Sequence, residues 1–208
     1  DGYLLKNFVK KKIKCLGIEP TKSTADAARK LGIEVIEEFF GENLAEKVLS
    51  RFGAADLIIG NNVYAHIPDI NDFTVGIEKL LSKEGIVTLE FNHIVPLIKN
   101  CQFDTIYHEH FEYHSLHSAQ TIFEKAGLKI WDVEEISTHG GSLRIYGSKN
   151  RSQKKISTRV KDLIQKEKDI GIQTIDYYKN FQEKCDSIKN EFLSFLIEKK
   201  NSGATIGS

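Results

Sequence analysis

Two patterns of apolar residues alternate along residues 1–148. Apolar residues three or four positions apart predict amphipathic helices, and short continuous apolar runs bounded by Gly or Pro predict buried strands. The helical pattern covers residues 4–9, 24–32, 42–53, 69–85 and 117–128, and the strand pattern covers residues 13–20, 33–40, 55–62 and 86–94. Strands separated by helices predict βαβ units, and therefore an α/β fold with helices on both faces of a parallel sheet.

The last two predicted strands break this alternation. Residues 129–136 and 142–148 both have strand character, and only the stretch "STHGG" separates them. A connection this short joins antiparallel neighbours, because parallel strands need a crossover of about a dozen residues or more. The sheet is therefore predicted to be mostly parallel and to close with an antiparallel hairpin.

The chain changes character at Arg151. From there it is polar and rich in Lys, with apolar residues such as Val160 and Leu163 at helical spacing. This pattern predicts two helices with a break near Gly171. We therefore divide the chain into an α/β domain over residues 1–150 and a helical connector to a further domain over residues 151–208.

Composition excludes several classes of function. Lys and Arg number 29 and so do Asp and Glu, so the chain has no overall charge that would attract nucleic acid or an anionic membrane. No apolar run approaches the roughly 20 residues that span a bilayer, and no segment resembles a signal peptide. The three cysteines are far apart and form no CxxC pair, which favours a reducing cytoplasm.

Both ends of the sequence indicate a fragment. The chain contains no Met, begins with "DGYLLKNF" inside an apparent turn, and ends with "NSGATIGS", where an apolar strand starts. We therefore expect the α/β domain to be truncated at its first strand.

Ligands of doubly wound sheets bind at the carboxyl ends of the strands, where this chain has three candidate features. Asp1 and Gly2 form a turn before the first helix, Glu19 ends the strand 13–20, and Asn61 with Asn62 ends the strand 55–62. Glycine allows close approach of the backbone to a ligand, and a carboxylate at a strand end can accept bonds from ribose hydroxyls. These features suit NAD as well as S-adenosylmethionine, and an ordinary turn also explains them. A sheet that ends in an antiparallel hairpin resembles that of the class I S-adenosylmethionine-dependent methyltransferases.

The stretch "YHEHFEYHSLH" holds four of the seven histidines. His110 and His114 are four residues apart, as in the zinc-binding HExxH motif, but Glu112 stands in the third position of the interval and not in the second. No carboxylate or Cys cluster completes a tetrahedral site, so we expect no metal here.

Five segments in order carry a more specific resemblance: "DGYLL", "GIEP", "NNVYAHIPDINDF", "FDTIYHEHFEYHSL" and "HGGSLR". Together they resemble the S-adenosylmethionine-dependent nucleotide-sugar C-methyltransferases, over residues 1–147. The resemblance implies a class I methyltransferase fold that binds S-adenosylmethionine, and a nucleotide-linked 4-keto-deoxysugar that is methylated at C-3. It places zinc only in an N-terminal domain that this sequence does not include, and "GATIGS" resembles the start of the family's C-terminal domain.

The same resemblance implies the active-site residues. Carbon methylation requires a base that removes a proton next to a ketone, a group that stabilises the enolate oxygen, and a dry site. By resemblance His110 is the base, Tyr107 donates to the keto oxygen, and Glu109 binds the sugar or orients a ring. Asn62 and His66 match positions that line the family's active site.

The remaining polar residues have two interpretations each. His108 is expected to face solvent by alternation along an extended segment, and His114 and His117 are expected to form the first turn of a helix with Ser118. Ser142 and Arg144 either reach the substrate or belong to an exposed turn, which also holds His139. His93 is open between the two interpretations.

Two other functions stay possible from the sequence alone. One is an NAD-dependent nucleotide-sugar oxidoreductase or epimerase, and the other is a non-catalytic cofactor-binding domain that binds a partner. The sequence leaves the oligomeric state open.

Overall fold

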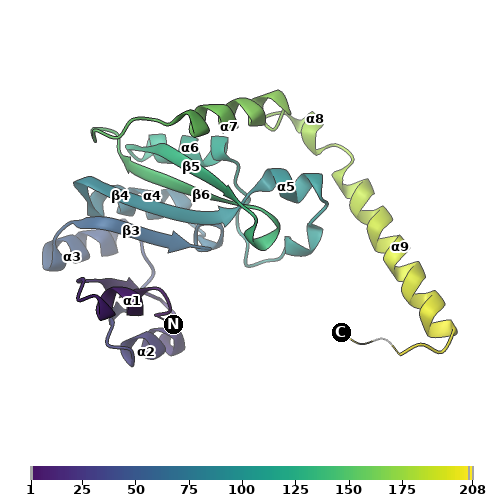
Figure 1. Cartoon of the computed structure of the whole chain (residues 1–208), viewed down its shortest axis with the longest axis horizontal. Coiled ribbons are helices and arrows are strands. Elements are labelled where there is room, and N and C mark those ends of the chain that lie inside the picture. The colour runs from purple at the N-terminus through teal and green to yellow at the C-terminus, as the bar shows by residue number, and fades with distance from the viewer. Residues whose placement is uncertain (1, 206, 208) are drawn as a thin grey trace.

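The computed structural model describes residues 2–205 and 207 and has an α/β fold that continues into a long helix (Figure 1). The strands are β1 (Leu16–Ile18), β2 (Glu34–Ile36), β3 (Ala55–Asn61), β4 (Leu81–Asn92), β5 (Leu128–Ile136) and β6 (Ser142–Lys149). The α-helices are α1 (Leu5–Lys10), α2 (Lys22–Arg29), α3 (Glu42–Phe52), α4 (Ile70–Leu80), α5 (Ile94–Lys99), α6 (Leu116–Lys125), α7 (Thr158–Asp169), α8 (Ile175–Tyr178) and α9 (Phe181–Asn201). Short 3₁₀ turns are η1 (Tyr64–His66), η2 (Phe103–Thr105) and η3 (Thr138–Gly140).

The main sheet has the order β3-β4-β6-β5. Strands β3 and β4 are parallel, whereas β6 is antiparallel to both β4 and β5. The predicted closing hairpin is therefore confirmed. Strands β1 and β2 form a separate parallel pair, which lies beside β3 in Figure 1 without a ladder to it among the described residues. The free edge of β3 leaves Leu57 46% exposed, although the sequence predicts a buried strand here.

Several predicted helix ends move by a few residues. Helix α2 begins after Thr21 and not after Thr24, which lies within it. Helix α4 ends at Leu80 and the chain continues directly into β4, so the helix predicted to residue 85 is too long. Asp69 starts α4 as a true cap, because its carboxylate accepts a hydrogen bond from Asp72 N at 3.0 Å.

The core lies on one face of the antiparallel part of the sheet. Alternate residues of each strand point to it, as the two-residue period of a strand requires. The buried cluster includes Val87, Leu89 and Phe91 of β4, Leu143 and Ile145 of β6, Ile77 of α4, and Leu116 and Phe123 of α6. This cluster fixes β4, whose carboxyl end forms part of the candidate site.

The opposite face of the same strands is polar. Glu90 of β4 is 5% exposed and accepts a hydrogen bond from Arg144 Nη2 of β6 at 2.8 Å. Tyr146 of β6 donates to Glu134 of β5 at 3.1 Å. On this face of β4, β5 and β6, an ion-pair network takes the place of a second core.

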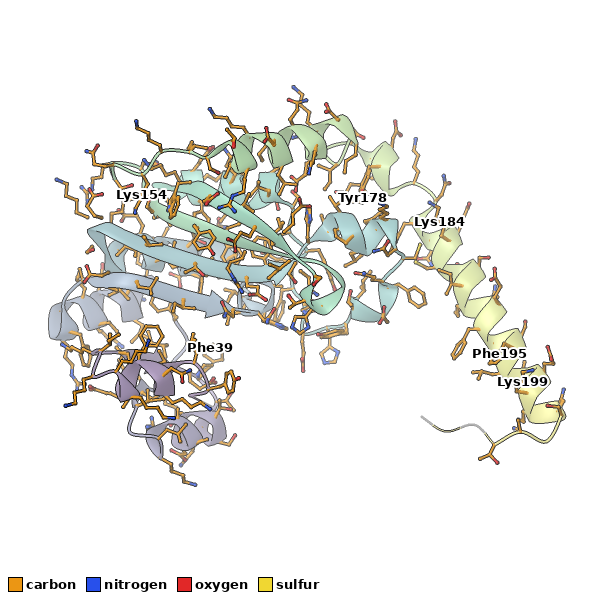
Figure 2. All side chains as sticks on the ribbon, viewed as in Figure 1. Phe39, Lys154, Tyr178, Lys184, Phe195 and Lys199 are labelled. Carbon is orange, nitrogen blue, oxygen red and sulfur yellow. The ribbon has the colours of Figure 1, made fainter. Side chains whose placement is uncertain are left out.

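The helices after residue 150 behave in two ways. Helix α7 buries Val160 and Leu163 in the main core, whereas α9 extends away from the body (Figure 1). Phe195, labelled in Figure 2, is one of several apolar residues of α9 that stay exposed. The predicted break near Gly171 is confirmed, and the short α8 was not predicted. Within the described part of the chain, no helix has the length and apolar content needed to cross a membrane.

A buried carboxylate joins α7 to the rest of the fold. Glu167 is 1% exposed, and its Oε1 lies 2.9 Å from His93 Nε2 at the end of β4. Its oxygens also accept hydrogen bonds from the backbone N–H groups of Leu116 at 2.7 Å and His117 at 2.9 Å. Those two N–H groups are the first of α6 and have no partner within the helix, so Glu167 caps α6 from another helix.

We expect Glu167→Gln to lower the free energy of unfolding by about 3 kcal/mol, because a neutral amide presents one acceptor oxygen and one NH₂ group to three donors around a buried site. Urea unfolding of this chain at neutral pH measures the change.

Glu198→Gln provides the control, since it makes the same chemical change on the exposed surface of α9. Equal stabilities for the two variants would show that the Glu167 contacts contribute nothing.

Candidate active site

A small pocket opens at the carboxyl ends of β3 and β4. Its volume is about 110 Å³, and its apolar wall is formed by Ala65 and Phe91. Its polar side chains come from four segments of the chain: Asn62, His66, Asn92, Tyr107, His110 and His139. Four of the predicted site residues, Asn62, His66, Tyr107 and His110, therefore meet in one place.

A buried tyrosine positions His66. Tyr64, the first residue of η1, is fully buried against Phe91 and Phe123. Thr74 donates its hydroxyl proton to the Ile70 carbonyl at 2.6 Å, so the Tyr64 hydroxyl must donate to Thr74 Oγ1 at 3.0 Å. Burial raises the pKa of the Tyr64 phenol, so it stays neutral.

Hydrogen bonds tie η1 to the histidine-rich loop. The Ala65 carbonyl accepts from the N–H groups of Phe111 at 2.9 Å and Glu112 at 3.3 Å. His66 Nδ1 lies 2.8 Å from the Glu109 carbonyl, to which it must donate because a carbonyl oxygen only accepts. The neutral ring of His66 therefore presents a bare Nε2.

The YHEH segment is a turn. His110 N donates to the Tyr107 carbonyl at 3.0 Å, so His108 and Glu109 occupy the two corners and both are exposed. The prediction that His108 faces solvent is confirmed, but the alternation argument behind it is wrong, because the segment is not extended. The carboxylate of Glu109 does not line the pocket, and this residue reaches the site through its carbonyl.

The turn places Tyr107 against His110. Their rings stack with centroids 4.3 Å apart, and the Tyr107 hydroxyl lies 3.2 Å from His110 Nε2. His110 Nδ1 lies 2.8 Å from the Thr105 carbonyl and must donate to it. Nε2 of neutral His110 is therefore unprotonated, and it is the nitrogen next to the Tyr107 hydroxyl. The His66 ring lies 4.7 Å away between centroids.

The turn between β5 and β6 closes another side of the pocket. His139 lines it with a left-handed backbone (φ 52°, ψ 37°). Gly141 has φ +120°, and a Cβ there would lie 2.8 Å from Pro96 Cγ of α5, so glycine is required. The sequence showed a turn rich in glycine, but nothing in it brought His139 to the pocket. Asn92 was also missed, although a polar residue at a strand end was the available signal.

Ser142 and Arg144 do not line the pocket. Ser142 is 2% exposed and its hydroxyl donates to the Thr138 carbonyl at 3.0 Å. Arg144 pairs with Glu90 at 2.8 Å and lies 3.8 Å from Glu134, and the hydrogen bond to Glu90 raises the pKa of its guanidinium. Both side chains thus stabilise the sheet in this structure, and their role in substrate binding stays a prediction.

Three of the predicted cofactor residues lie at strand ends. Glu19 follows β1, and one oxygen of its half-buried carboxylate accepts from Thr21 N at 2.8 Å. Asn61 ends β3 with an exposed side chain, and Asn62 follows in a left-handed conformation (φ 53°) that asparagine tolerates. Gly2 has φ +76°, and a Cβ there would lie 2.6 Å from Ile33 Cδ1, so packing alone explains this glycine. Asp1 lies outside the described residues.

His93 and His114 are buried behind the pocket. The ring of His93 pairs with Glu167, and the backbone N–H of His93 donates to the Gly141 carbonyl at 3.1 Å. His114 packs against Tyr64 and Phe91, and burial lowers its pKa to about 4. Its Nε2 lies 3.2 Å from Glu112 Oε2, but without the geometry of a hydrogen bond. The first turn of α6 is capped by Ser115 with Ser118, so His117 and Ser118 lie in that turn as predicted and His114 lies before it.

No group of three or more His, Cys, Asp or Glu side chains in residues 2–205 and 207 is arranged to hold a metal ion. Cys15, Cys101 and Cys185 are free thiols. Proton chemistry by imidazole and phenol groups is thus what the pocket residues themselves offer.

The chain is similar in sequence to known proteins. Residues 137–208 match the family described as the C-methyltransferase C-terminal domain. The chain is 32% identical over 191 residues to C-methyltransferase NovU from Streptomyces niveus, a match that covers 92% of this chain and 46% of that protein. The chain is related in sequence to the C-methyltransferases. The predicted resemblance is confirmed at this level.

Solved structures confirm the fold. A SAM-dependent methyltransferase from Anabaena variabilis superposes with a TM-score of 0.57 at 14% identity, over 72% of this chain and 74% of that one. Magnesium protoporphyrin IX methyltransferase from Synechocystis, with bound SAH, gives a TM-score of 0.54 at 13% identity, over 72% and 70% of the two chains. The fold is that of the class I SAM-dependent methyltransferases. The chain spans less than half of the length of NovU.

The neutral His114 makes a pH-dependent contribution to stability. Its pKa of about 4 lies below the roughly 6.5 of an unfolded chain, so the unfolded state binds more protons between these values. We expect about 3 kcal/mol of stability to be present above about pH 6.5 and to be lost as the pH falls towards 4. Urea unfolding of His114→Gln across this range should show a shallower dependence on pH than the parent chain.

His108→Gln is the control for this measurement, since the ring of His108 is exposed on a turn corner. An unchanged slope in His114→Gln would contradict the assignment.

Proposed function

We propose that this chain is the catalytic part of a SAM-dependent C-methyltransferase that methylates C-3 of a nucleotide-linked 4-keto-deoxysugar through an enolate. Similarity to a C-methyltransferase and the methyltransferase fold support the reaction class. One observation carries the mechanism: the Thr105 carbonyl holds the Nδ1 proton of His110, which leaves Nε2 free to accept a proton in the pocket.

The cofactor residues fit a nucleoside with a ribose diol. The carboxylate of Glu19 can accept hydrogen bonds from both ribose hydroxyls, and Thr21 engages only one of its oxygens. Asn61 and Asn62 present amides at the neighbouring strand end, next to the pocket that Asn62 lines. When bound, S-adenosylmethionine supplies an electrophilic methyl group, so the chain itself needs to provide only positioning and proton transfer.

Proton removal begins with the Tyr107–His110 pair. Before substrate binds, the Tyr107 hydroxyl donates to His110 Nε2. The proton at C-3 of the sugar can reach Nε2 only when this hydroxyl turns away, and the turned hydroxyl becomes a donor for the substrate. The Tyr107 donor role that the sequence predicts is thus available in the second state. Thr105 keeps the ring in place in both states.

The dimensions of the pocket limit what enters it. About 110 Å³ is well below the roughly 300–1,000 Å³ of a site for a whole drug-sized ligand. Only the reacting edge of the sugar ring fits between the imidazoles and Phe91, and the nucleotide stays outside. Glu109, exposed on the corner of the turn, is on the outer side of the pocket and is proposed to hydrogen-bond the sugar there.

The substrate class is tested with the full-length protein. We expect S-adenosylmethionine and at least one dTDP-linked 4-keto-deoxysugar to give a product heavier by one methylene unit in mass spectrometry. Fragmentation should place the added carbon on the sugar ring. A panel of such sugars that yields no heavier product would exclude this substrate class.

The base is tested with His110→Ala in the full-length protein. We expect turnover to fall by at least about 10²-fold, since a general base contributes about 10²–10⁴ to the rate. Calorimetry should show cofactor affinity close to that of the parent protein, because His110 does not lie at the ends of β1 or β3.

His108→Ala removes a neighbouring imidazole that faces away from the pocket, and it should keep full activity. Loss of cofactor binding in step with turnover in His110→Ala would show that His110 only maintains the structure.

A further inference from the structure

We propose that His139 is a further catalytic residue, which donates a hydrogen bond to the C-4 oxygen of the substrate as negative charge develops there. This inference rests on the proposed function and adds a second donor for the enolate oxygen beside Tyr107. His139 lies on η3, in the turn between β5 and β6, and lines the same pocket as His110 and Tyr107.

The hydrogen bonds of the pocket imidazoles distinguish His139 from the others. His66 and His110 each give their Nδ1 proton to a backbone carbonyl, which makes them acceptors towards the pocket when neutral. Neither ring nitrogen of His139 has a hydrogen-bond partner among residues 2–205 and 207. A neutral imidazole always carries one N–H, so His139 can present a donor that no protein group already uses.

The pocket offers few other hydrogen-bond donors to an oxygen that gains negative charge. No Lys or Arg is among the side chains that line it. The nearby Arg144 is bound to Glu90, and the Tyr107 hydroxyl donates to His110 in the structure. Once Tyr107 has turned away from His110, an oxygen that gains charge in this pocket finds the Tyr107 hydroxyl, the amides of Asn62 and Asn92 and the ring of His139. Of these groups, only the imidazole can also become a cation.

Two hydrogen bonds hold the backbone that follows His139. Gln102 Nε2 donates to the Gly140 carbonyl at 2.9 Å, and the His93 N–H donates to the Gly141 carbonyl at 3.1 Å. His139 keeps a left-handed conformation that a non-glycine residue adopts at a cost, and such conformations gather at functional sites. The turn thus holds the backbone of His139 in a fixed place at the edge of the pocket, which favours a preorganised donor.

Formation of the enolate moves two electron pairs and one proton. The electron pair of the C-3–H bond forms the C-3–C-4 double bond, and the pair of the C-4 carbonyl bond moves onto its oxygen. The proton goes to His110 Nε2. The N–H of His139 shares its proton with the charged oxygen without transferring it, and the bond is released when C-3 takes the methyl group and the carbonyl re-forms.

Exchange of the C-3 proton tests this role before methyl transfer. The full-length protein is incubated in D₂O with S-adenosylhomocysteine and the dTDP-linked 4-keto-deoxysugar that gives methylated product, and NMR follows loss of the C-3 proton. We expect His139→Gly to slow both exchange and methyl transfer by about 10²-fold or more, the effect of removing one oxyanion donor. Glycine suits the left-handed backbone, so the turn keeps its shape.

Conservative and control variants separate chemistry from structure. His139→Gln retains an N–H donor and should recover at least about tenfold of the lost rate, whereas a packing role would not depend on the N–H. His108→Ala should exchange at the parent rate. Affinity for S-adenosylhomocysteine should be unchanged in all variants. A melting curve shows whether His139→Gly is folded, and His139→Ala decides in its place if it is not.

The outcomes divide cleanly. Exchange by the parent protein together with exchange by folded His139→Gly within about threefold would overturn this inference alone. A parent protein that neither exchanges nor methylates any sugar of the panel would overturn the proposed function, and this inference with it.

Discussion

The buried carboxylate of Glu167 is the contact on which the arrangement of the site depends. It comes from α7, far along the chain, and it binds the first N–H groups of α6 and the ring of His93 at the end of β4. A charge removed from water is costly unless its lone pairs are satisfied, and here three donors satisfy them. Two backbone hydrogen bonds connect this framework to the loops of the pocket. Ile94 N donates to the His114 carbonyl, and His93 N donates to the Gly141 carbonyl. Helix α7 is therefore part of the framework of the site.

Backbone carbonyls decide what the histidines of the pocket can do. His66 and His110 carry the same side chain as His139, yet each has one nitrogen bound to a carbonyl and the other left as an acceptor. The chemical roles thus follow from two carbonyl oxygens, those of Glu109 and Thr105. A turn and a short 3₁₀ segment supply these oxygens, which explains why a small irregular region carries most of the proposed chemistry.

Sequence periodicity predicted much of the fold. The parallel strands, the closing hairpin and the break at Gly171 are all found, since they follow from local pattern and loop length. Helix α5 was missed because it is short and Pro96 lies in its first turn, where proline is tolerated but reads as a breaker. The cap at Thr24 was wrong by one turn, because Thr21 leaves Ala25 and Ala28 on the buried face.

For the site, the sequence by itself determined which chemical groups are present and that several follow strand ends: Asn62 and His66 after β3, and the YHEH motif that matches a family. Only the tertiary structure decided which of them meet. It folded YHEH into a turn, which moved Glu109 to an exposed corner, and it paired Arg144 with Glu90 instead of with the pocket. It also brought His139 into the same pocket as His110, although the two residues are 29 positions apart in the chain. Local pattern fixes where a strand or helix begins, but contacts between distant segments depend on packing and on hydrogen bonds that close only when the whole chain is folded.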